Sequence, residues 1–277
     1  MRLYSLQGFG VERGSLLLAP SCVTPRSFAN VVADTAGHAA RLAEAQRLRG
    51  KIAVQEGAIP ASELLPDGRH VQPADRQSWH LLTLDADGRV AACMRYHEHP
   101  SDATFEDLSI CSSSLAQSED WGPQLRHAVE ADLRDARRRG WSYVELGGWV
   151  ISEAMRCTTE ALRMIASAYA FAQLCGGAMG VTTASTRRCS AAILKRIGGQ
   201  RLRSRGMELP SFYDSHYRCH MEVLRFDSSR PNPRYRHWMD ACRTRLQQDI
   251  RVICRETADT QAGNALEFDP EAIEDVA

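Results

Sequence analysis

Residues 141–151 read WSYVELGGWVI, a mainly apolar run that predicts a buried β-strand. A helical pattern follows over residues 158–175, and residues 178–184 form a second short apolar run. A strand, a helix and a strand at this spacing predict two neighbouring parallel strands joined by a right-handed crossover. We therefore expect a parallel strand pair in this part of the chain.

The N-terminal part divides into an irregular segment and a first helix. Residues 1–33 carry prolines and mixed polar residues without a sustained period, so we expect an irregular lead-in. Asp34 or Thr35 can cap a helix over residues 37–49, and Gly50 is expected to end it.

A hairpin and a second helix are predicted between the first helix and the parallel pair. Two apolar runs, residues 79–84 and 90–96, flank Asp87-Gly88, a pair that is typical of tight β-hairpin turns. A further helix is expected to have Pro123 in its first turn and to end at Gly140.

The C-terminal half adds a helix, two closing strands and a terminal helix. A further helix is predicted over residues 186–197, and the two closing strands are expected over 200–203 and 217–226. Residues 231–256 carry a helical apolar pattern. This order of elements predicts an α/β (α+β) fold in which helices cover a mixed sheet.

The same order suggests how the chain is divided. After the lead-in we expect one main domain over residues 34–227 and a C-terminal helical extension over 228–260. Residues 261–277 are acidic and contain Thr and Ala, so they are predicted to be a disordered tail.

The composition favours a cytoplasmic protein without a nucleic-acid or membrane partner. Of the 277 residues, 34 are Lys or Arg and 34 are Asp or Glu, so no net charge attracts the chain to nucleic acid. The N-terminus lacks the pattern of a signal peptide, and no run reaches the roughly 20 apolar residues that span a bilayer. We expect no stable membrane insertion.

The cysteines and histidines do not form a recognisable metal motif. The nine cysteines are scattered without a C-x-x-C pair, which is typical of reduced cytosolic thiols. His97 and His99 flank Glu98, and His216 and His220 stand four apart, so a metal site can be imagined. The partners that would complete a coordination shell are missing, and we expect no metal.

Five segments carry a family resemblance. They are EAQRLRGKIAVQEG (44–57), the hairpin 79–96 that ends in Met94-Arg95-Tyr96, VELGGWVI (144–151), CSAAILKRIGG (189–199) and FYDSHYRCHMEVLRFD (212–227). In this order they resemble the GNAT superfamily, specifically its branch of acyl-homoserine-lactone (autoinducer) synthases and long-chain N-acyl amino acid synthases. The resemblance covers about two thirds of the chain, and the last segment is its most diagnostic part.

The resemblance implies a GNAT-like, mostly antiparallel sheet with a central splayed parallel pair and a C-terminal helix. It implies an N-acyltransferase that moves an acyl group from an acyl carrier protein or CoA thioester to an amino acid or similar small amine. By the same resemblance the acyl group is expected to be long-chain. An ordinary GNAT acetyltransferase using acetyl-CoA and a non-catalytic domain that binds an acyl ligand are the alternatives. A shared fold alone does not decide between these three functions.

In a GNAT fold the splayed strand exposes main-chain groups to the ligand, and here that strand is residues 144–151. Gly147 and Gly148 in its middle indicate either close approach of a substrate or a simple bulge. In the first case an amide near Trp149 or Val150 polarises the thioester carbonyl and stabilises the oxyanion.

The start of the following helix is the expected phosphate site. Free amides near Arg156, Cys157, Thr158 and Thr159 can hold the phosphate of a carrier phosphopantetheine, although either threonine can also be an ordinary N-cap. The family's Gly-rich pyrophosphate loop is absent, which favours acyl carrier protein over CoA. Cys157 can alternatively be a nucleophile, but direct attack of the amine is the preferred mechanism.

Three charged residues are the remaining candidates. The resemblance places Glu145 where a carboxylate engages the incoming amine, and Arg95 and Asp75 match an arginine and an acidic residue of the family. An ion pair between Glu145 and Arg95 is the competing explanation for a carboxylate in an apolar strand. The family's arginine just after the strand glutamate is replaced by Gly147 and Gly148, which weakens the case for homoserine lactone chemistry.

Two larger sets of residues have both a functional and a structural interpretation. An apolar set can line an acyl slot or simply form the core: Trp149, Leu162, Ile165, Tyr169 and Leu174. A basic set can dock an acidic carrier protein or simply face solvent: Arg187, Arg188, Lys195, Arg196, Arg201, Arg203 and Arg205.

Overall fold

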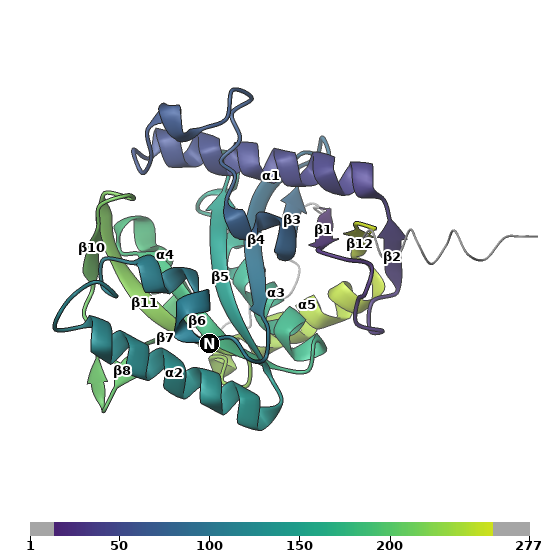
Figure 1. The fold of residues 1–277 in the computed structure, drawn as a ribbon. Coiled ribbons are helices and arrows are strands. Elements are labelled where there is room, and N and C mark those ends of the chain that lie inside the picture. Colours follow the sequence, from purple (N-terminus) through teal and green to yellow (C-terminus); the bar gives the residue numbers. More distant parts are fainter. Residues whose placement is uncertain (1–13, 257–277) are drawn as a thin grey trace, which may run out of the picture.

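A ten-stranded mixed sheet organises the protein (Figure 1). The computed structural model describes residues 14–256, apart from the side chain of residue 188. Its strands are β1 (Ser15–Ala19), β2 (Asn30–Ala33), β3 (Trp79–Leu84), β4 (Val90–His99), β5 (Ser142–Ile151), β6 (Ala178–Ser185), β7 (Gln200–Arg201), β8 (Arg203–Ser204), β9 (Met207–Glu208), β10 (Phe212–Asp214), β11 (Cys219–Asp227) and β12 (Arg251–Cys254).

The order across the sheet is β10-β11-β6-β5-β4-β3-β1-β12-β2, with β7 paired to β11, while β8 and β9 form a separate hairpin. The β5–β6 pair is parallel, as expected, and most of the other pairs are antiparallel. Two further parallel pairs, β1–β12 and β12–β2, form the far edge of the sheet and were not predicted.

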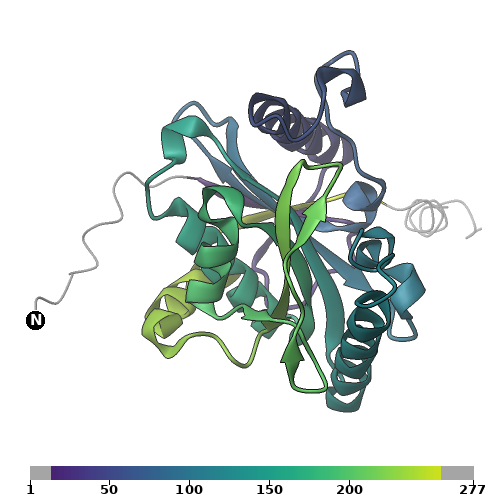
Figure 2. The same cartoon turned by 90° about the vertical axis from the view of Figure 1, so that its left-hand side faces the viewer.

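Five helices cover the two faces of this sheet: α1 (Thr35–Gln55), α2 (Gly122–Arg139), α3 (Glu160–Leu174), α4 (Ser190–Ile197) and α5 (Arg236–Gln248). Helices α1 and α2 lie on one face, which we call the α1/α2 face, and the other three lie opposite (Figure 2). None of the helices described in residues 14–256 is long and apolar enough to span a membrane.

The hairpin and the two best-marked helices are confirmed. β3 begins and ends where the sequence predicts, and Gly88 has the positive φ of +74° that a tight turn needs. The Asp34 side chain accepts a hydrogen bond from the Gly37 N–H and caps α1. Helix α2 ends at Gly140, whose φ of +65° is the left-handed conformation of a C-cap glycine.

The expected irregular lead-in over residues 1–33 is wrong for its described part. Residues 15–19 and 30–33 form β1 and β2, which enter the main sheet beside β3 and β12. The run Leu16-Leu17-Leu18 is buried on both faces, which explains why it shows no alternation. Residues 1–13 lie outside the described part.

The expected C-terminal helical extension is also only partly correct. Helix α5 stops at Gln248, and β12 returns the chain to the main sheet, where Val252 and Ile253 are buried between β1 and β2. The β-branched pair fits a strand better than a helix. The structure therefore does not separate residues 228–256 from the main sheet, and the predicted tail, 261–277, lies outside the described residues.

Gly50 does not end the first helix, because α1 continues to Gln55. A Cβ atom on Gly50 would lie 2.5 Å from the carbonyl oxygen of Gly68 and 3.0 Å from Leu64 Cδ2. The glycine therefore allows the loop after α1 to pack closely against the helix. This contact explains why a residue that usually terminates helices stands inside one.

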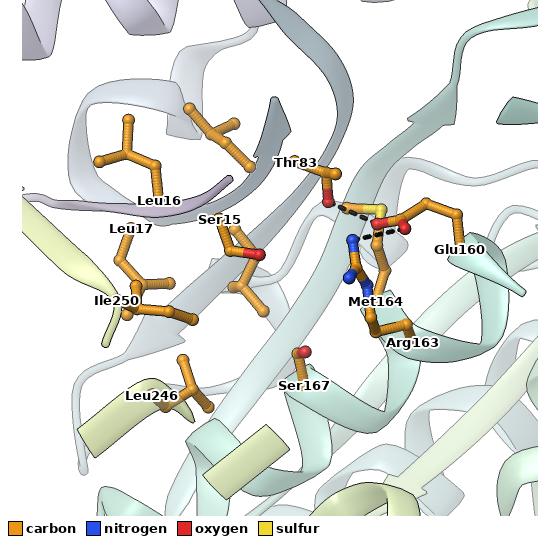
Figure 3. A pocket seen from close by; sticks show the side chains of 12 residues that line it. Ser15, Leu16, Leu17, Thr83, Glu160, Arg163, Met164, Ser167, Leu246 and Ile250 are labelled. Carbon is orange, nitrogen blue, oxygen red and sulfur yellow. Dashed lines mark hydrogen bonds and ion pairs between the residues drawn. The ribbon is translucent and has the colours of Figure 1, made fainter. Parts of the chain in front are cut away.

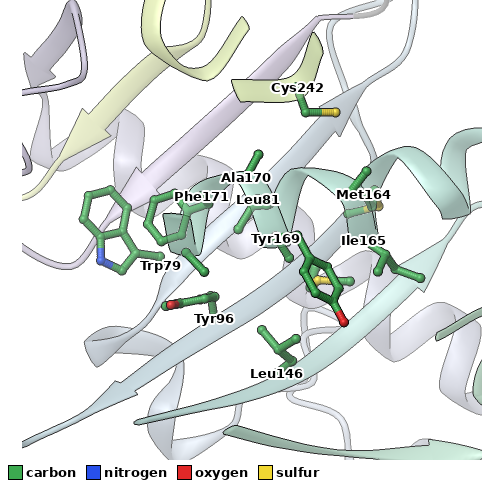
Figure 4. Close-up of a cluster of buried hydrophobic side chains, with 14 of the residues drawn as sticks. Trp79, Leu81, Tyr96, Leu146, Met164, Ile165, Tyr169, Ala170, Phe171 and Cys242 are labelled. Atoms are coloured by element: carbon green, nitrogen blue, oxygen red, sulfur yellow. The ribbon is translucent and has the colours of Figure 1, made fainter. Parts of the chain in front are cut away.

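An aromatic core fastens α3 to the sheet on the face opposite α1 (Figure 4). Phe171 stacks at an angle against Trp79 of β3, with ring centroids 5.0 Å apart, and meets Tyr96 of β4 edge-on at 4.9 Å. Tyr169 contacts Phe226 of β11 at 4.5 Å. Helix α3 thus holds strands from both sides of the β5–β6 pair.

Candidate active site

The parallel pair β5–β6 separates part-way along its length. Its register runs from Ser142 opposite Ala178 to Glu145 opposite Val181 and then stops. β5 continues to Ile151, while β6 stays paired with β11 up to Ser185. The main-chain groups of residues 146–151 that point toward β6 are therefore not used by that strand.

A bulge in β5 marks the separated part. Arg95 pairs with Gly147 and Cys93 pairs with Val150, so Gly148 and Trp149 together stand opposite Met94. Gly148 has a φ of +58°, which only glycine adopts at little cost. The bulge, which is one of the two explanations that the sequence offers for Gly147 and Gly148, is thus present.

The two glycines also make room for arginine side chains. A Cβ atom on Gly148 would lie 2.9 Å from Arg49 Nη1, and one on Gly147 would lie 3.2 Å from Arg95 Nη2. Both guanidinium groups therefore pack directly against the main chain of β5 on the α1/α2 face. Positive charge is fixed beside the bulge in this way.

Asp75 holds these arginines together. It lies in the 3₁₀ helix Pro73–Gln77 and is 1% exposed. Arg49 donates to both of its carboxylate oxygens, at 2.8 and 2.5 Å, and the Gln46 side chain and the Gln72 N–H each donate at 3.0 Å. Burial alone would raise the pKa of Asp75, but the hydrogen bonds and charge of Arg49 lower it strongly.

Arg95 is the less satisfied of the two arginines. Its Nη1 donates to Gln72 Oε1 at 2.6 Å and lies 3.4 Å from Asp75 Oδ1. Among the residues that the structure describes, its Nε–H is buried without a hydrogen-bond partner, as are the Nε–H of Arg49 and the indole N–H of Trp149. Buried donors without partners are rare in folded proteins and mark positions where a ligand can bind.

Glu145 lies on the same face but is fully occupied. Its carboxylate is bonded to His99 Nε2 at 3.0 Å and accepts from the Ser109 N–H, the Ser109 hydroxyl and the Ile110 N–H at 2.9, 2.7 and 3.1 Å. Burial would raise the pKa of Glu145, but these hydrogen bonds lower it. The competing explanation, an ion pair with Arg95, is not found; Arg95 bonds Gln72 and Asp75 instead.

Two histidines of β4, His97 and His99, lie next to Glu145. His99 bonds Glu145, and His97 Nδ1 lies 3.0 Å from the Ser78 hydroxyl. Burial and the neighbouring His99 lower the pKa of His97 to about 4, so it is neutral at pH 7. Within residues 14–256, no group of three His, Cys, Asp or Glu side chains is arranged to hold a metal ion.

The expected phosphate segment lies at the end of β5. Arg156 forms an ion pair with Glu56 of the loop after α1 at 2.6 Å, and Cys157 is exposed with a φ of +60°. Helix α3 begins at Glu160, two residues later than predicted, and the Glu160 N–H donates to the Thr158 hydroxyl at 3.2 Å. The N-cap position is Thr159, whose side chain makes no capping hydrogen bond, and it is the preceding Thr158 that bonds the first N–H of the helix.

Some members of each of the two larger residue sets have the structural role that was the alternative for them. Ile165 and Tyr169 are buried in the core beneath α3, as Figure 4 shows. Lys195 and Arg201 both form ion pairs with Glu222, at 2.8 and 2.7 Å. These contacts neutralise part of the basic set.

A narrow crevice elsewhere in the molecule contains none of the predicted site residues (Figure 3). It lies between β1, β3, α3 and α5, and at its rim Glu160 accepts from the Thr83 hydroxyl at 2.5 Å and pairs with Arg163 at 2.6 Å. Glu160 and Arg163 therefore form an ion pair at the start of α3.

Sequence reasoning missed Arg49, Gln46 and Gln72, which complete the Asp75 cluster. Arg49 stands in the apolar register of α1, three residues before Ile52 and four after Ala45, both buried. An arginine at a core position of a helix is the signal that would have identified it, because a buried charge requires a partner.

Comparisons with known proteins support the fold. No family model matches the chain, and no curated protein matches it. The structure of BjaI, a CoA-dependent acyl-homoserine lactone synthase, with SAM and isopentyl-CoA has a TM-score of 0.53 at 17% identity and covers 91% of this chain and 99% of BjaI. The BjaI structure with MTA gives 0.52 at 18% identity and the same coverage.

FeeM, an N-acyl amino acid synthase from uncultured soil microbes, has a TM-score of 0.45 at 10% identity and covers 78% of this chain and 92% of FeeM. This likeness is too weak to choose between the two branches named from the sequence. The BjaI comparisons confirm the predicted architecture: the chain has the GNAT-like α/β fold seen in an acyl-homoserine lactone synthase.

Proposed function

We propose that the protein is an N-acyltransferase that moves an acyl group from a thioester to the amine of a small molecule. The observation that carries this proposal is the separation of β5 from β6 after Glu145, beside a bulged strand. A pantetheine arm is an extended chain with amide groups, and it matches the main-chain donors and acceptors of an unpaired strand edge. The fold shared with BjaI agrees with this use.

In the proposed reaction the thioester carbonyl lies near Trp149 and Val150. A main-chain N–H at the bulge polarises the carbonyl, the amine nitrogen attacks its carbon, and the negative charge on oxygen is stabilised by that donor. The C–S bond then breaks, the thiol leaves with a proton, and the amine loses one proton as the amide forms. No covalent enzyme intermediate is required, because both substrates are held together.

The acceptor is proposed to bind on the α1/α2 face, where Arg95 has unused donors. Glu145 is proposed to act there only through its charge. Its carboxylate oxygens are already hydrogen-bonded within the protein, so it is a fixed negative charge near the amine and does not bind the amine directly. Asp75 positions Arg95 and Arg49. Gly147 and Gly148 allow these groups to approach β5.

For the donor we propose that residues 156–159 lie at the phosphate end of the pantetheine arm. Cys157 at positive φ and exposed Thr159 expose main-chain groups just before α3. Acyl carrier protein remains the preferred donor because this segment lacks a Gly-rich loop. Acyl-CoA is the alternative, and the neighbour BjaI is described as CoA-dependent.

The direct test measures release of free thiol from acetyl, octanoyl and palmitoyl thioesters, each offered on CoA and on acyl carrier protein. The acceptors are the proteinogenic amino acids and S-adenosylmethionine, with mass spectrometry of the products. We expect amine-dependent release with octanoyl or palmitoyl donors. A preference for acetyl-CoA would instead indicate an ordinary acetyltransferase, and no release with any donor would indicate a binding domain.

A further inference from the structure

His97 of β4 lies next to the point where β5 and β6 separate. In the sheet it stands opposite Glu145, which is the last residue of β5 that pairs with β6. Its ring meets that of His99, which bonds Glu145, with the ring centroids 4.5 Å apart. Side chains two residues apart in a strand share a face, so His97 is on the α1/α2 face with its neighbours His99 and Arg95. This is the side proposed for the acceptor.

The hydrogen bonds of Ser78 determine which nitrogen of His97 carries the proton. Ser78 is 0% exposed, and its hydroxyl donates to the Ala74 carbonyl at 2.6 Å. A hydroxyl has one proton, so the Ser78 oxygen can only accept in its second contact, with His97 Nδ1 at 3.0 Å. Nδ1 of the neutral ring therefore carries the hydrogen, and Nε2 has a free lone pair.

This lone pair is accessible and unused within the described part of the chain. The ring is half-buried, and its hydrogen bond to Ser78 is made through the other nitrogen. Nε2 does not belong to the polar atoms that are sealed in the interior without a partner, so a water molecule or a substrate can reach it. His97 thus presents a proton acceptor on the acceptor side of the sheet.

The carboxylates on this face have already used their lone pairs. Both oxygens of Glu145 accept two hydrogen bonds each, and Asp75 is surrounded by donors from Arg49, Gln46 and Gln72. A group that must take up a proton needs a lone pair that is free to receive it. The imidazole meets this requirement better than either carboxylate does.

The charges around His97 suit a neutral ring that becomes charged for a short time. Burial, His99 and Arg95 lower the pKa of His97 to about 4, whereas Glu145 and the main chain of Gln77 raise it. The ring is therefore neutral at pH 7 and keeps its lone pair. When Nε2 takes up a proton, the negative charge of Glu145 on the opposite strand stabilises the imidazolium.

We propose that His97 is the general base for the acceptor amine, and that its Nε2 takes up, through one bound water, the proton that the amine loses. This step rests on the proposed function. The amine nitrogen gives its lone pair to the thioester carbon, its N–H proton passes to the water, and the water passes a proton to Nε2. The C–S bond then breaks, and the imidazolium gives its proton back to the leaving thiolate, so the ring ends as it began.

The protonation of the ring is tested on wild type without any substrate. Carbon-13 and nitrogen-15 NMR of the histidine rings distinguishes the Nδ1–H form, the Nε2–H form and the charged ring, and the spectrum of His97→Asn assigns the signals. We expect His97 to be neutral and protonated at Nδ1 at pH 7, and Ser78→Ala to shift it toward the Nε2–H form. A charged ring or an Nε2–H ring in wild type at pH 7 would overturn the proposal.

The proton transfer is tested with His97→Asn, whose side-chain amide can still donate to Ser78 but has no counterpart of Nε2. His237→Asn is the control, because His237 is exposed on α5, on the opposite face of the sheet. With octanoyl-CoA and the amine that reacts with wild type, turnover at pH 7 is expected to fall by about 10²–10⁴-fold in His97→Asn only. The KM for octanoyl-CoA is expected to stay unchanged.

The pH dependence separates a base from a structural residue. The ratio of wild-type to His97→Asn turnover should shrink as the pH rises from 7 to 9.5, because hydroxide then removes the proton. An unchanged turnover in His97→Asn, or the same loss at every pH, would show that His97 is not the base. Urea unfolding checks that the variant is folded, and His97→Gln takes its place if it is not. Wild type that consumes no thioester would refute the proposed function and this step with it, whereas the NMR result tests the protonation of His97 independently.

Discussion

At Glu145, four hydrogen bonds converge on a carboxylate that is 7% exposed. Two of the donors belong to the main chain of the 3₁₀ helix Ser109–Ser112, so the carboxylate fixes a loop that has no strand to support it. The residue was singled out because an isolated carboxylate in an apolar strand needs a partner. The partners proved to be His99 and this loop, and the sequence does not show that the loop returns to β5.

Glu145→Gln is therefore expected to destabilise the protein as well as to slow it. An amide NH₂ would replace one acceptor oxygen and face N–H donors, leaving at least one buried group unsatisfied at a cost of about 1–3 kcal/mol. Urea unfolding measures the effect, with exposed Glu119→Gln as the control. Equal stability of the two variants would show that the hydrogen bonds to Glu145 contribute little.

The buried His80 predicts a pH dependence of stability. Burial lowers its pKa from 6.5 to about 4, and its Nε2 is bonded to the Asp75 carbonyl at 2.8 Å. The unfolded chain therefore takes up a proton more readily, so this contribution is complete above pH 6.5 and is lost as the pH falls toward 4. The loss amounts to at most about 3 kcal/mol.

The measurement is the free energy of unfolding of wild type and of His80→Gln between pH 7.5 and 4.5. The variant carries no titrating group at this position, so its stability should fall less steeply than that of wild type between pH 6.5 and 4.5. Parallel curves would contradict the assignment to His80.

At the scale of elements, the bulge in β5 connects the sheet to the arginine cluster. Gly148→Ala introduces two costs: a Cβ at a φ of +58° and a clash with Arg49 Nη1 at 2.9 Å. Gly140→Ala is a matched control, because Gly140 has a φ of +65° and nothing lies within 4 Å of its added Cβ. The control isolates the backbone cost, about 1–2 kcal/mol.

We expect Gly148→Ala to lower the free energy of unfolding by at least about 1 kcal/mol more than Gly140→Ala does, because Arg49 must move from Asp75. Thermal or urea unfolding of both variants checks this. If the two substitutions cost the same, the packing of Arg49 against β5 is not as described.

Elements with strong local signals were predictable, and those fixed by distant partners were not. Gly88 and Gly140 mark turns that depend on their own residues, so the hairpin and the end of α2 were found from sequence. β1 and β12 are short and pair with each other across more than 200 residues. Neither segment contains a local pattern that identifies its partner strand. The sequence therefore predicts an irregular lead-in where β1 forms and a helix where β12 forms.

At the scale of the whole molecule, the α1/α2 face carries two separate apolar clusters, one under each helix. The polar side chains of Arg95 and Glu145 lie between them on β4 and β5, where Arg95 is opposite Gly147 and Glu145 is opposite His97. Asp75, Arg95 and the two glycines were each named from the sequence, and the structure brings them together beside β5. Arg49 and Gln46 come from α1, far from β5 in the chain, and only the fold brings them to the same place.

The central claim is that the thioester donor lies along the part of β5 that β6 does not pair. Amide chemical shifts measured by NMR during titration with octanoyl-CoA test it most directly. We predict that the largest shifts occur in residues 146–151 and 152–160, with smaller ones in β6. Shifts confined to other surfaces, with residues 146–151 unchanged at saturation, would contradict the claim.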